Sequence, residues 1–290
     1  MAANLSTSSF DNFHHCSSST TANYIATAFD ITQISLLLPL YLTVLYLGHQ
    51  KWRQQRSFAT TSHSDIFTYN LAAIELLYAL GATFYYCTSY FGLSELTILW
   101  FSLCSIVIPG ETCFHILTCV ERYLAVVHPV TYLGLRRVGG VRIRNVSIGC
   151  VWLLCLGWMG IIAVYSPGFP FILYFIFLAF SLVVVSFCSL SVLCVLIRSG
   201  PGDMAGGRAR VDQSKQRAFH TITAITAVLW LFFIGFLVCV ALDSSNLLSY
   251  NIGCLVLFSA NWITLPNSLV LPLLFLQRSG KLVCCRSSNK

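Results

Sequence analysis

Long apolar runs dominate this chain, and short polar segments separate them. A bilayer core about 30 Å thick needs about 20 apolar residues for each helical crossing. Lipid offers the backbone no hydrogen-bond partners, so a run of this length has to form a helix there. The pattern predicts seven membrane-spanning helices, at residues 24–47, 66–91, 96–123, 146–165, 169–197, 219–242 and 247–276.

Basic residues divide the connecting segments into two sets. All 17 Lys and Arg residues lie on one side of the seven predicted crossings, and the alternate segments contain none. The positive-inside rule makes the basic side cytosolic. The sequence therefore predicts an all-α integral membrane protein, a seven-transmembrane helix bundle with its N-terminus outside and its C-terminus cytosolic. We expect a Ser/Thr-rich extracellular tail at 1–23, the transmembrane domain at 24–276 and a short basic cytosolic tail at 277–290.

Composition agrees with a chain embedded in lipid, since 57% of residues are hydrophobic and 9% are charged. The net charge of +7 reports topology, so we do not interpret it as nucleic-acid binding. Most cysteines fall inside the predicted helices, where Cys behaves as a small apolar residue. Cys284 and Cys285 follow the last helix beside basic residues and form a candidate palmitoylation site; a plain reduced pair is the alternative. Asn4 opens a glycosylation sequon, and we predict no metal site.

Four motifs follow one another along the predicted helices. The second helix carries NLAAIEL from Asn70, and the third ends in ERYLAVVHP from Glu121. Trp152 lies in the fourth helix, and the seventh carries NSLVLPLLF from Asn267. Together, over residues 64–285, these motifs resemble the rhodopsin-type (class A) G-protein-coupled receptors, of which this chain would be a divergent, orphan-like member. The resemblance implies a plasma-membrane receptor whose partner is a heterotrimeric G protein, with arrestin as a second candidate partner.

The resemblance also assigns roles to individual residues. It implies that Glu121, Arg122 and Tyr123 form the G-protein coupling element, with Arg122 paired to Glu121 at rest and swinging inward on activation. A snorkelling arginine that only marks the membrane edge is the alternative. Pro272 and Phe275 occupy the activation motif of the seventh helix. No catalytic residue is implied, and the chain shows no nucleophile motif of an intramembrane hydrolase, so we do not expect an enzyme.

Several features of the family are missing from this chain. The sixth-helix CWxP element lacks its Trp and Pro, with Gly235 at the Pro position. In the seventh helix, Leu271 replaces the Asn of NPxxY and Phe275 replaces its Tyr. The Asn of the first helix and the cysteines of the outer disulfide are also absent. A seven-helix protein that no longer signals therefore stays open as an alternative.

Two carboxylates lie deep in the predicted membrane. Glu75 and Glu111 are each about eleven residues, or ~16 Å, from the cytosolic ends of their helices. Neighbouring carboxylates do not both ionise unless a cation lies between them, so we expect one shared proton or one Na⁺ acting as an allosteric ion. His115, Asn267 and Ser268 complete this predicted intramembrane polar site, at a depth where ionisable groups tend to be functional. A structural Glu111–His115 pair is the alternative.

The outer half of the bundle is aromatic and carries no Lys or Arg to hold an anion. In amine receptors of the family an Asp occupies the position of Cys104, so the resemblance disfavours an amine ligand. We expect a small, apolar ligand in a pocket formed by Tyr86, Trp100, Cys104, Phe233 and Trp262.

An ion- or proton-coupled carrier is the main rival, since Glu75, Glu111 and His115 could form a relay. Carriers usually show internal repeats and paired broken helices. The sequence indicates neither, so it favours a receptor over a carrier.

Overall fold

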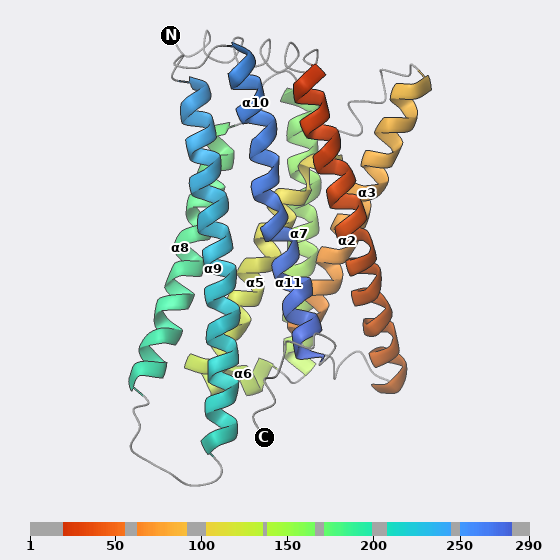
Figure 1. The fold of residues 1–290 in the computed structure, drawn as a ribbon. Coiled ribbons are helices and arrows are strands. Elements are labelled where there is room, and N and C mark those ends of the chain that lie inside the picture. Colours follow the sequence, from red (N-terminus) through yellow and green to blue (C-terminus); the bar gives the residue numbers. More distant parts are fainter. Residues whose placement is uncertain are drawn as a thin grey trace, which may run out of the picture.

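The computed structural model describes residues 20–55, 63–91, 103–135, 138–165, 171–198, 208–244 and 250–279. Nearly all of these residues lie in helices (Figure 1). The predicted sites at Asn4, Trp100, Cys284 and Cys285 lie outside the described residues.

Seven helical segments are long and apolar enough to cross a membrane, in agreement with the sequence. Each crossing is one helix except the third, in which a turn at Ile106 separates residues 103–105 from α5, and the last. The helices are α2 (Thr20–Gln55), α3 (His63–Phe91), α5 (Val107–Val127), α7 (Val138–Tyr165), α8 (Phe171–Arg198), α9 (Arg208–Ser244), α10 (Tyr250–Ala260) and α11 (Leu265–Arg278), with a short helix α6 (Pro129–Leu135) between α5 and α7.

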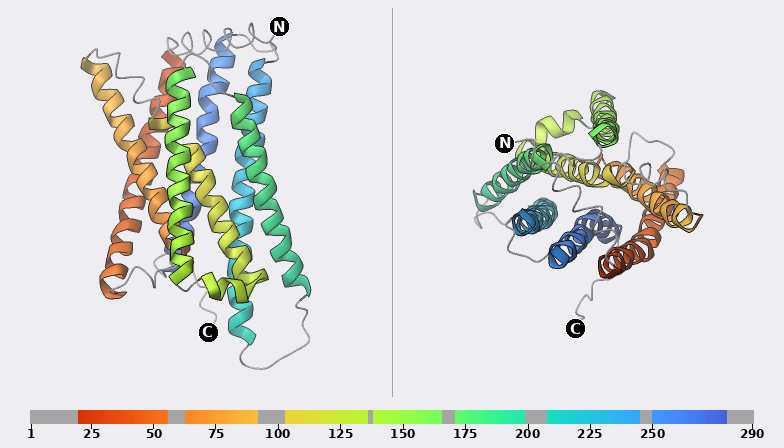
Figure 2. Two further views of the ribbon diagram at one scale, coloured as in Figure 1. Left: turned by 180° about the vertical axis from the view of Figure 1, so that it is seen from behind. Right: turned by 90° about the horizontal axis from the view of Figure 1, so that it is seen from above.

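The helices run up and down in one bundle, with the start of α2 and the end of α11 at opposite ends of it (Figure 1). We call these the N-terminal end, where α2 begins, and the C-terminal end, where α11 ends. α5 runs obliquely between the others (Figure 2) and packs against α3, α7, α8, α9 and α11. Its side chains are therefore buried on most sides, which makes α5 the natural centre for a functional site.

Large apolar side chains also cover the outside of the bundle. Leu153 on α7, Phe180 and Val183 on α8 and Leu231 on α9 are all largely exposed. In water such a surface would be unfavourable, whereas hydrocarbon chains solvate it well. The exposed faces thus agree with a multi-pass membrane protein.

The seventh crossing is interrupted, which corrects the continuous helix predicted for 247–276. A single 3₁₀ turn, η3 (Asn261–Thr264), separates α10 from α11. Pro266, in the first turn of α11, has no N–H to continue the hydrogen-bond ladder, and its ring clashes with the preceding turn. Gly235 of α9 accommodates the break, because a Cβ there would lie 2.6 Å from Ile263 Cδ1. Close packing against Ile263 therefore explains why a glycine suits position 235.

Candidate functional site

A buried polar cluster lies midway along the bundle, where α3, α5 and α11 meet. Glu75 comes from α3, Glu111 and His115 from α5, and Asn267 and Ser268 from α11. Glu111 and His115 are four residues apart, so they lie on one face of α5. All five side chains are buried. The structure therefore brings together the whole set that the sequence predicted as an intramembrane polar site.

Asn267 bridges the two polar residues of α5. Its Nδ2 donates to Glu111 Oε2 at 2.7 Å, and its carbonyl oxygen lies 3.1 Å from His115 Nε2. A proton on Nε2 makes His115 the donor of this second bond. The described residues include no direct Glu111–His115 hydrogen bond, which corrects the structural pair considered above. The cluster instead ties α5 to α11.

The carboxyl groups of Glu75 and Glu111 have fewer hydrogen-bond donors beside them than their oxygen atoms could accept from. The carboxyl groups of Glu111 and Glu75 lie close enough to interact electrostatically. Gln33 Nε2 of α2 approaches Glu75 Oε2 at 3.4 Å. Within the described part of the chain, the Oε1 atoms of both glutamates have no hydrogen-bond partner. Two ionised carboxylates in this arrangement would repel strongly, so the arrangement disfavours both being charged at once.

Pro272 explains a second contact of the cluster. A proline at this position cannot donate to the carbonyl of Ser268, four residues earlier in α11. Tyr41 of α2 supplies the missing donor, since its hydroxyl donates to the Ser268 carbonyl oxygen at 2.6 Å. Phe275, one turn further on, packs edge-on against Tyr69 of α3 at 5.6 Å between ring centroids. The predicted activation motif therefore joins α11 to α2 and α3.

A second polar network lies at the C-terminal end. Arg122 Nη2 of α5 donates to Ser64 Oγ at 2.8 Å, and Arg278 Nη1 of α11 donates to the same oxygen at 2.5 Å. Asp65 Oδ2 pairs with Lys51 Nζ at 2.6 Å, and Asp65 Oδ1 lies 3.8 Å from Arg278 Nη1. One side-chain network thus joins α2, α3, α5 and α11.

Glu121 turns away from Arg122, contrary to the expected resting ion pair. Among the described residues the two side chains form no ion pair. Glu121 Oε1 instead accepts from the Tyr132 hydroxyl of α6 at 3.3 Å. Successive helical residues point about 100° apart, so Glu121 faces α6 while Arg122 faces α3. Tyr123, the third residue of the motif, has its hydroxyl 3.2 Å from His128 Nε2.

Two of the sequence motifs meet through a hydrogen bond. Trp152 Nε1 of α7 donates to Asn70 Oδ1 of α3 at 3.0 Å. The pairing fixes α7, otherwise a peripheral helix, against the centre of the bundle.

The described residues of the predicted ligand pocket contact several helices. Trp262 packs edge-on against Phe29 of α2, with ring centroids 5.8 Å apart. Phe233 packs against Phe175 of α8 at 6.3 Å between ring centroids. Cys104, at the start of the third crossing, and Phe233 are both partly buried against the main apolar core. The ligand pocket stays a prediction.

Asp30 of α2 is a buried acid that sequence reasoning missed. Its two carboxylate oxygens accept hydrogen bonds from the hydroxyls of Tyr78 at 2.7 Å and Tyr86 at 2.8 Å. The signal was present, because Asp30 is the single charged residue in the predicted crossing 24–47. An ionisable residue inside a span is a functional candidate by default.

Comparison with known proteins returned no relative: no protein-family model matches the chain, and no curated protein matches it.

Proposed function

We propose that this chain is a plasma-membrane receptor of the rhodopsin type, which passes a signal from a small ligand to a heterotrimeric G protein. The observation that carries the proposal is Arg122, in its Glu-Arg-Tyr element, at the C-terminal end of the central helix α5. Its guanidinium is held by one hydroxyl, that of Ser64, and not by a carboxylate. A modest rearrangement would therefore release it to a partner.

α11 offers a route from the buried cluster to Arg122. Its first turn holds Asn267, which contacts Glu111 and His115 of the cluster. Its last turn holds Arg278, which shares Ser64 with Arg122. A shift of α11 would therefore disturb both sites together, and packed helices of this kind switch between discrete arrangements. We infer that ligand binding biases the position of α11 and so frees Arg122.

α6 supplies a second contact for the partner. Tyr132 faces inward to Glu121, whereas Val130 and Leu133 are exposed at the C-terminal end. Exposed apolar side chains beside a polar network suit a protein-binding site. We propose that the G protein contacts this helix together with Arg122, and that arrestin, the second candidate partner, uses the same end.

The buried cluster is proposed as an allosteric ion site. The facing carboxyls of Glu75 and Glu111 would share a proton or hold one Na⁺. No organic cofactor enters the proposal.

Nucleotide exchange on purified G proteins tests the proposal. The receptor in lipid nanodiscs is mixed with one Gα of each main class, without ligand and with a panel of lipids and lipophilic amines. We expect Arg122→Ala to abolish the exchange that wild type promotes, at near-normal surface expression. Arg142→Ala is the matched control, because Arg142 is an exposed arginine on α7. Exchange that survives in Arg122→Ala would contradict the coupling role.

A proton- or ion-coupled carrier is the second candidate, favoured by the interrupted seventh crossing next to three titratable residues. Such carriers place discontinuous helices around a midplane site. Reconstituted proteoliposomes distinguish the two: a carrier would acidify the lumen or take up Na⁺ under a gradient, and a receptor would do neither.

A further inference from the structure

Asp30 lies in the half of the bundle towards the N-terminal end, and its side chain is 7% exposed. Both carboxylate oxygens accept hydrogen bonds from phenol groups, those of Tyr78 and Tyr86. Two donors suit an ionised carboxylate, which can only accept. Within the described residues no Lys, Arg or His pairs with Asp30. An ionised Asp30 would therefore have two donors but no counter-ion among the described residues.

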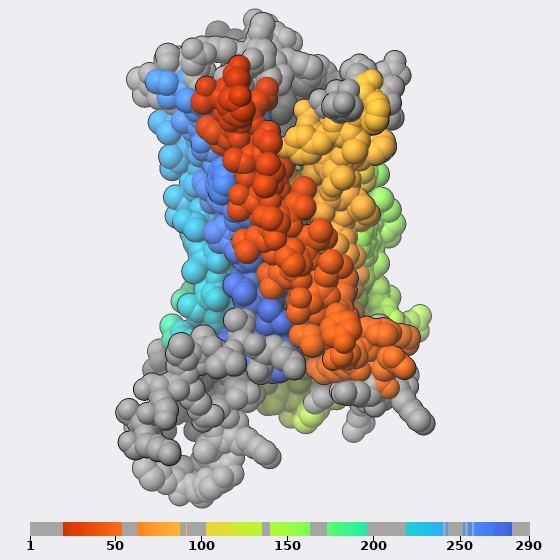
Figure 3. Space-filling model, turned by 45° about the vertical axis from the view of Figure 1, so that its right-hand side comes forward, coloured from red at the N-terminus to blue at the C-terminus, as the bar shows by residue number. Residues whose placement is uncertain are grey.

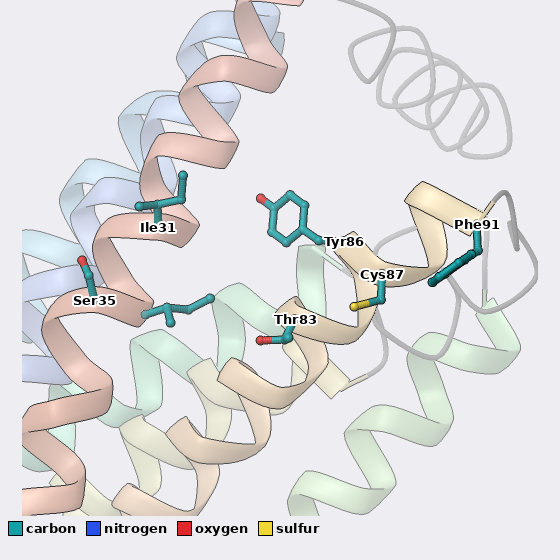
Figure 4. A pocket seen from close by; sticks show the side chains of 7 residues that line it. Ile31, Ser35, Thr83, Tyr86, Cys87 and Phe91 are labelled. Carbon is teal, nitrogen blue, oxygen red and sulfur yellow. The ribbon is translucent and has the colours of Figure 1, made fainter.

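An open groove lies beside this acid, between the halves of α2 and α3 near the N-terminal end. It has a volume of about 530 Å³, within the range of small-molecule sites. Figure 3 shows the face of the bundle on which α2 and α3 meet. The groove is lined by Ile31, Ile34, Ser35, Thr83, Tyr86, Cys87 and Phe91 (Figure 4).

The walls of this groove are apolar although they include two hydroxyl residues. The Ser35 hydroxyl donates to the Thr32 carbonyl, and the Thr83 hydroxyl donates to the Ala79 carbonyl. Both hydroxyls are thus engaged by their own helices and offer little to a ligand. Ile31, on the rim, is largely exposed on a surface that faces hydrocarbon in a membrane.

Tyr86 connects the groove with the acid. Its side chain reaches from α3 towards α2 (Figure 4), and its hydroxyl donates to Asp30 Oδ2. Rotation of this one ring would open the carboxylate to the groove.

We propose that the groove binds a long-chain primary amine that enters from the lipid. Its ammonium group pairs with Asp30 in place of the Tyr86 hydroxyl, and its hydrocarbon chain lies along Ile31, Ile34 and Phe91. The ammonium group would give an ionised Asp30 the counter-ion that it lacks among the described residues. The claim that this amine is the receptor's ligand rests on the proposed function. The claim that the groove binds such an amine does not.

Thermal melting of the purified protein in phosphatidylcholine nanodiscs tests the site, with dodecylamine as the probe. Dodecanol has the same chain without the charge, and butylamine has the charge without the chain. We expect dodecylamine to raise the melting temperature of wild type clearly more than either control. Asp30→Asn should weaken dodecylamine binding at least tenfold and leave the response to dodecanol unchanged.

A second pair of variants keeps the test decisive if Asp30→Asn fails to fold. Cys87→Trp fills the groove without touching Asp30, whereas Leu80→Trp places the same bulk on an exposed site of α3 outside it. Dodecylamine should no longer stabilise Cys87→Trp and should stabilise Leu80→Trp like wild type. Equal stabilisation of wild type by dodecylamine and dodecanol, or full response in Cys87→Trp, would overturn the proposal. No G protein is present, so neither result depends on whether the protein couples to one.

Discussion

The buried cluster and the C-terminal network are built from the same helices but balance charge in opposite ways. At the centre, Glu75 and Glu111 face each other with amide donors and no cation. At the C-terminal end, Asp65 is held between Lys51 and Arg278. Depth explains the difference, because long basic side chains reach water at the end of a helix and cannot do so at its middle. The end is therefore held by ion pairs, whereas at the centre two acids lie close together with only amide donors beside them.

Asp65→Asn should give the largest loss of stability. The substitution leaves Lys51 and Arg278 without their shared counter-ion. Breaking a buried pair costs about 3–5 kcal/mol, and partial exposure of Lys51, at 44%, reduces this to about 2–3 kcal/mol. Melting in nanodiscs measures the loss. Lys51→Met, which removes only the exposed partner, should cost less than about 1 kcal/mol; equal losses would contradict this account.

Glu111→Gln should change how stability depends on solution conditions more than it changes stability itself. If the pair shares a proton, the folded state binds more protons than the unfolded state at neutral pH, so raising the pH destabilises the fold. If Na⁺ lies between the carboxyls, wild type should melt higher in Na⁺ than in a bulky organic cation, and the gain should grow logarithmically with concentration.

The same variant decides between these two accounts and a purely structural cluster. Glu111→Gln is nearly isosteric with wild type, and it should flatten whichever response wild type shows. Melting that ignores both Na⁺ and pH in wild type and variant alike would leave the cluster with a structural role only.

Tyr41→Phe should cost about 1–2 kcal/mol, because it leaves the Ser268 carbonyl buried without a donor. Pro272→Ala restores a backbone N–H that can take this place. In the Pro272→Ala background the cost of Tyr41→Phe should therefore shrink, with a coupling of about 1 kcal/mol in a double-mutant cycle. Strictly additive effects would show that the proline and the tyrosine do not share this carbonyl.

Gln33→Leu should have the smallest effect. Its bond to Glu75 is long, at 3.4 Å, and its own Oε1 has no partner among the described residues, so the loss should stay within about 1 kcal/mol. Melting in nanodiscs measures the loss, and a loss as large as that of Asp65→Asn would contradict this expectation.

The number of helices and the depth of their polar residues could be predicted from the sequence, because both depend only on the lengths of its apolar runs. Runs of about 20 apolar residues indicate seven helices, and the rise per residue places Glu75 and Glu111 at the same depth. Their meeting follows from that depth and from the packing of α3 against α5. The missed Asp30 was equally visible as a lone acid in an apolar run.

The sequence by itself thus determined how many helices cross and at what depth each polar residue lies. Only the tertiary structure decided which partner each polar side chain contacts. The choice of partner depends on how each helix is rotated about its axis and tilted against its neighbours. That rotation turns Glu121 to Tyr132 and Arg122 to Ser64, although the two are adjacent in the chain. It also lets Asn267 stand between Glu111 and His115, where residue spacing on α5 suggested a direct pair. The depth of a residue depends on its own helix alone, whereas the direction in which its side chain points depends on how the whole bundle packs.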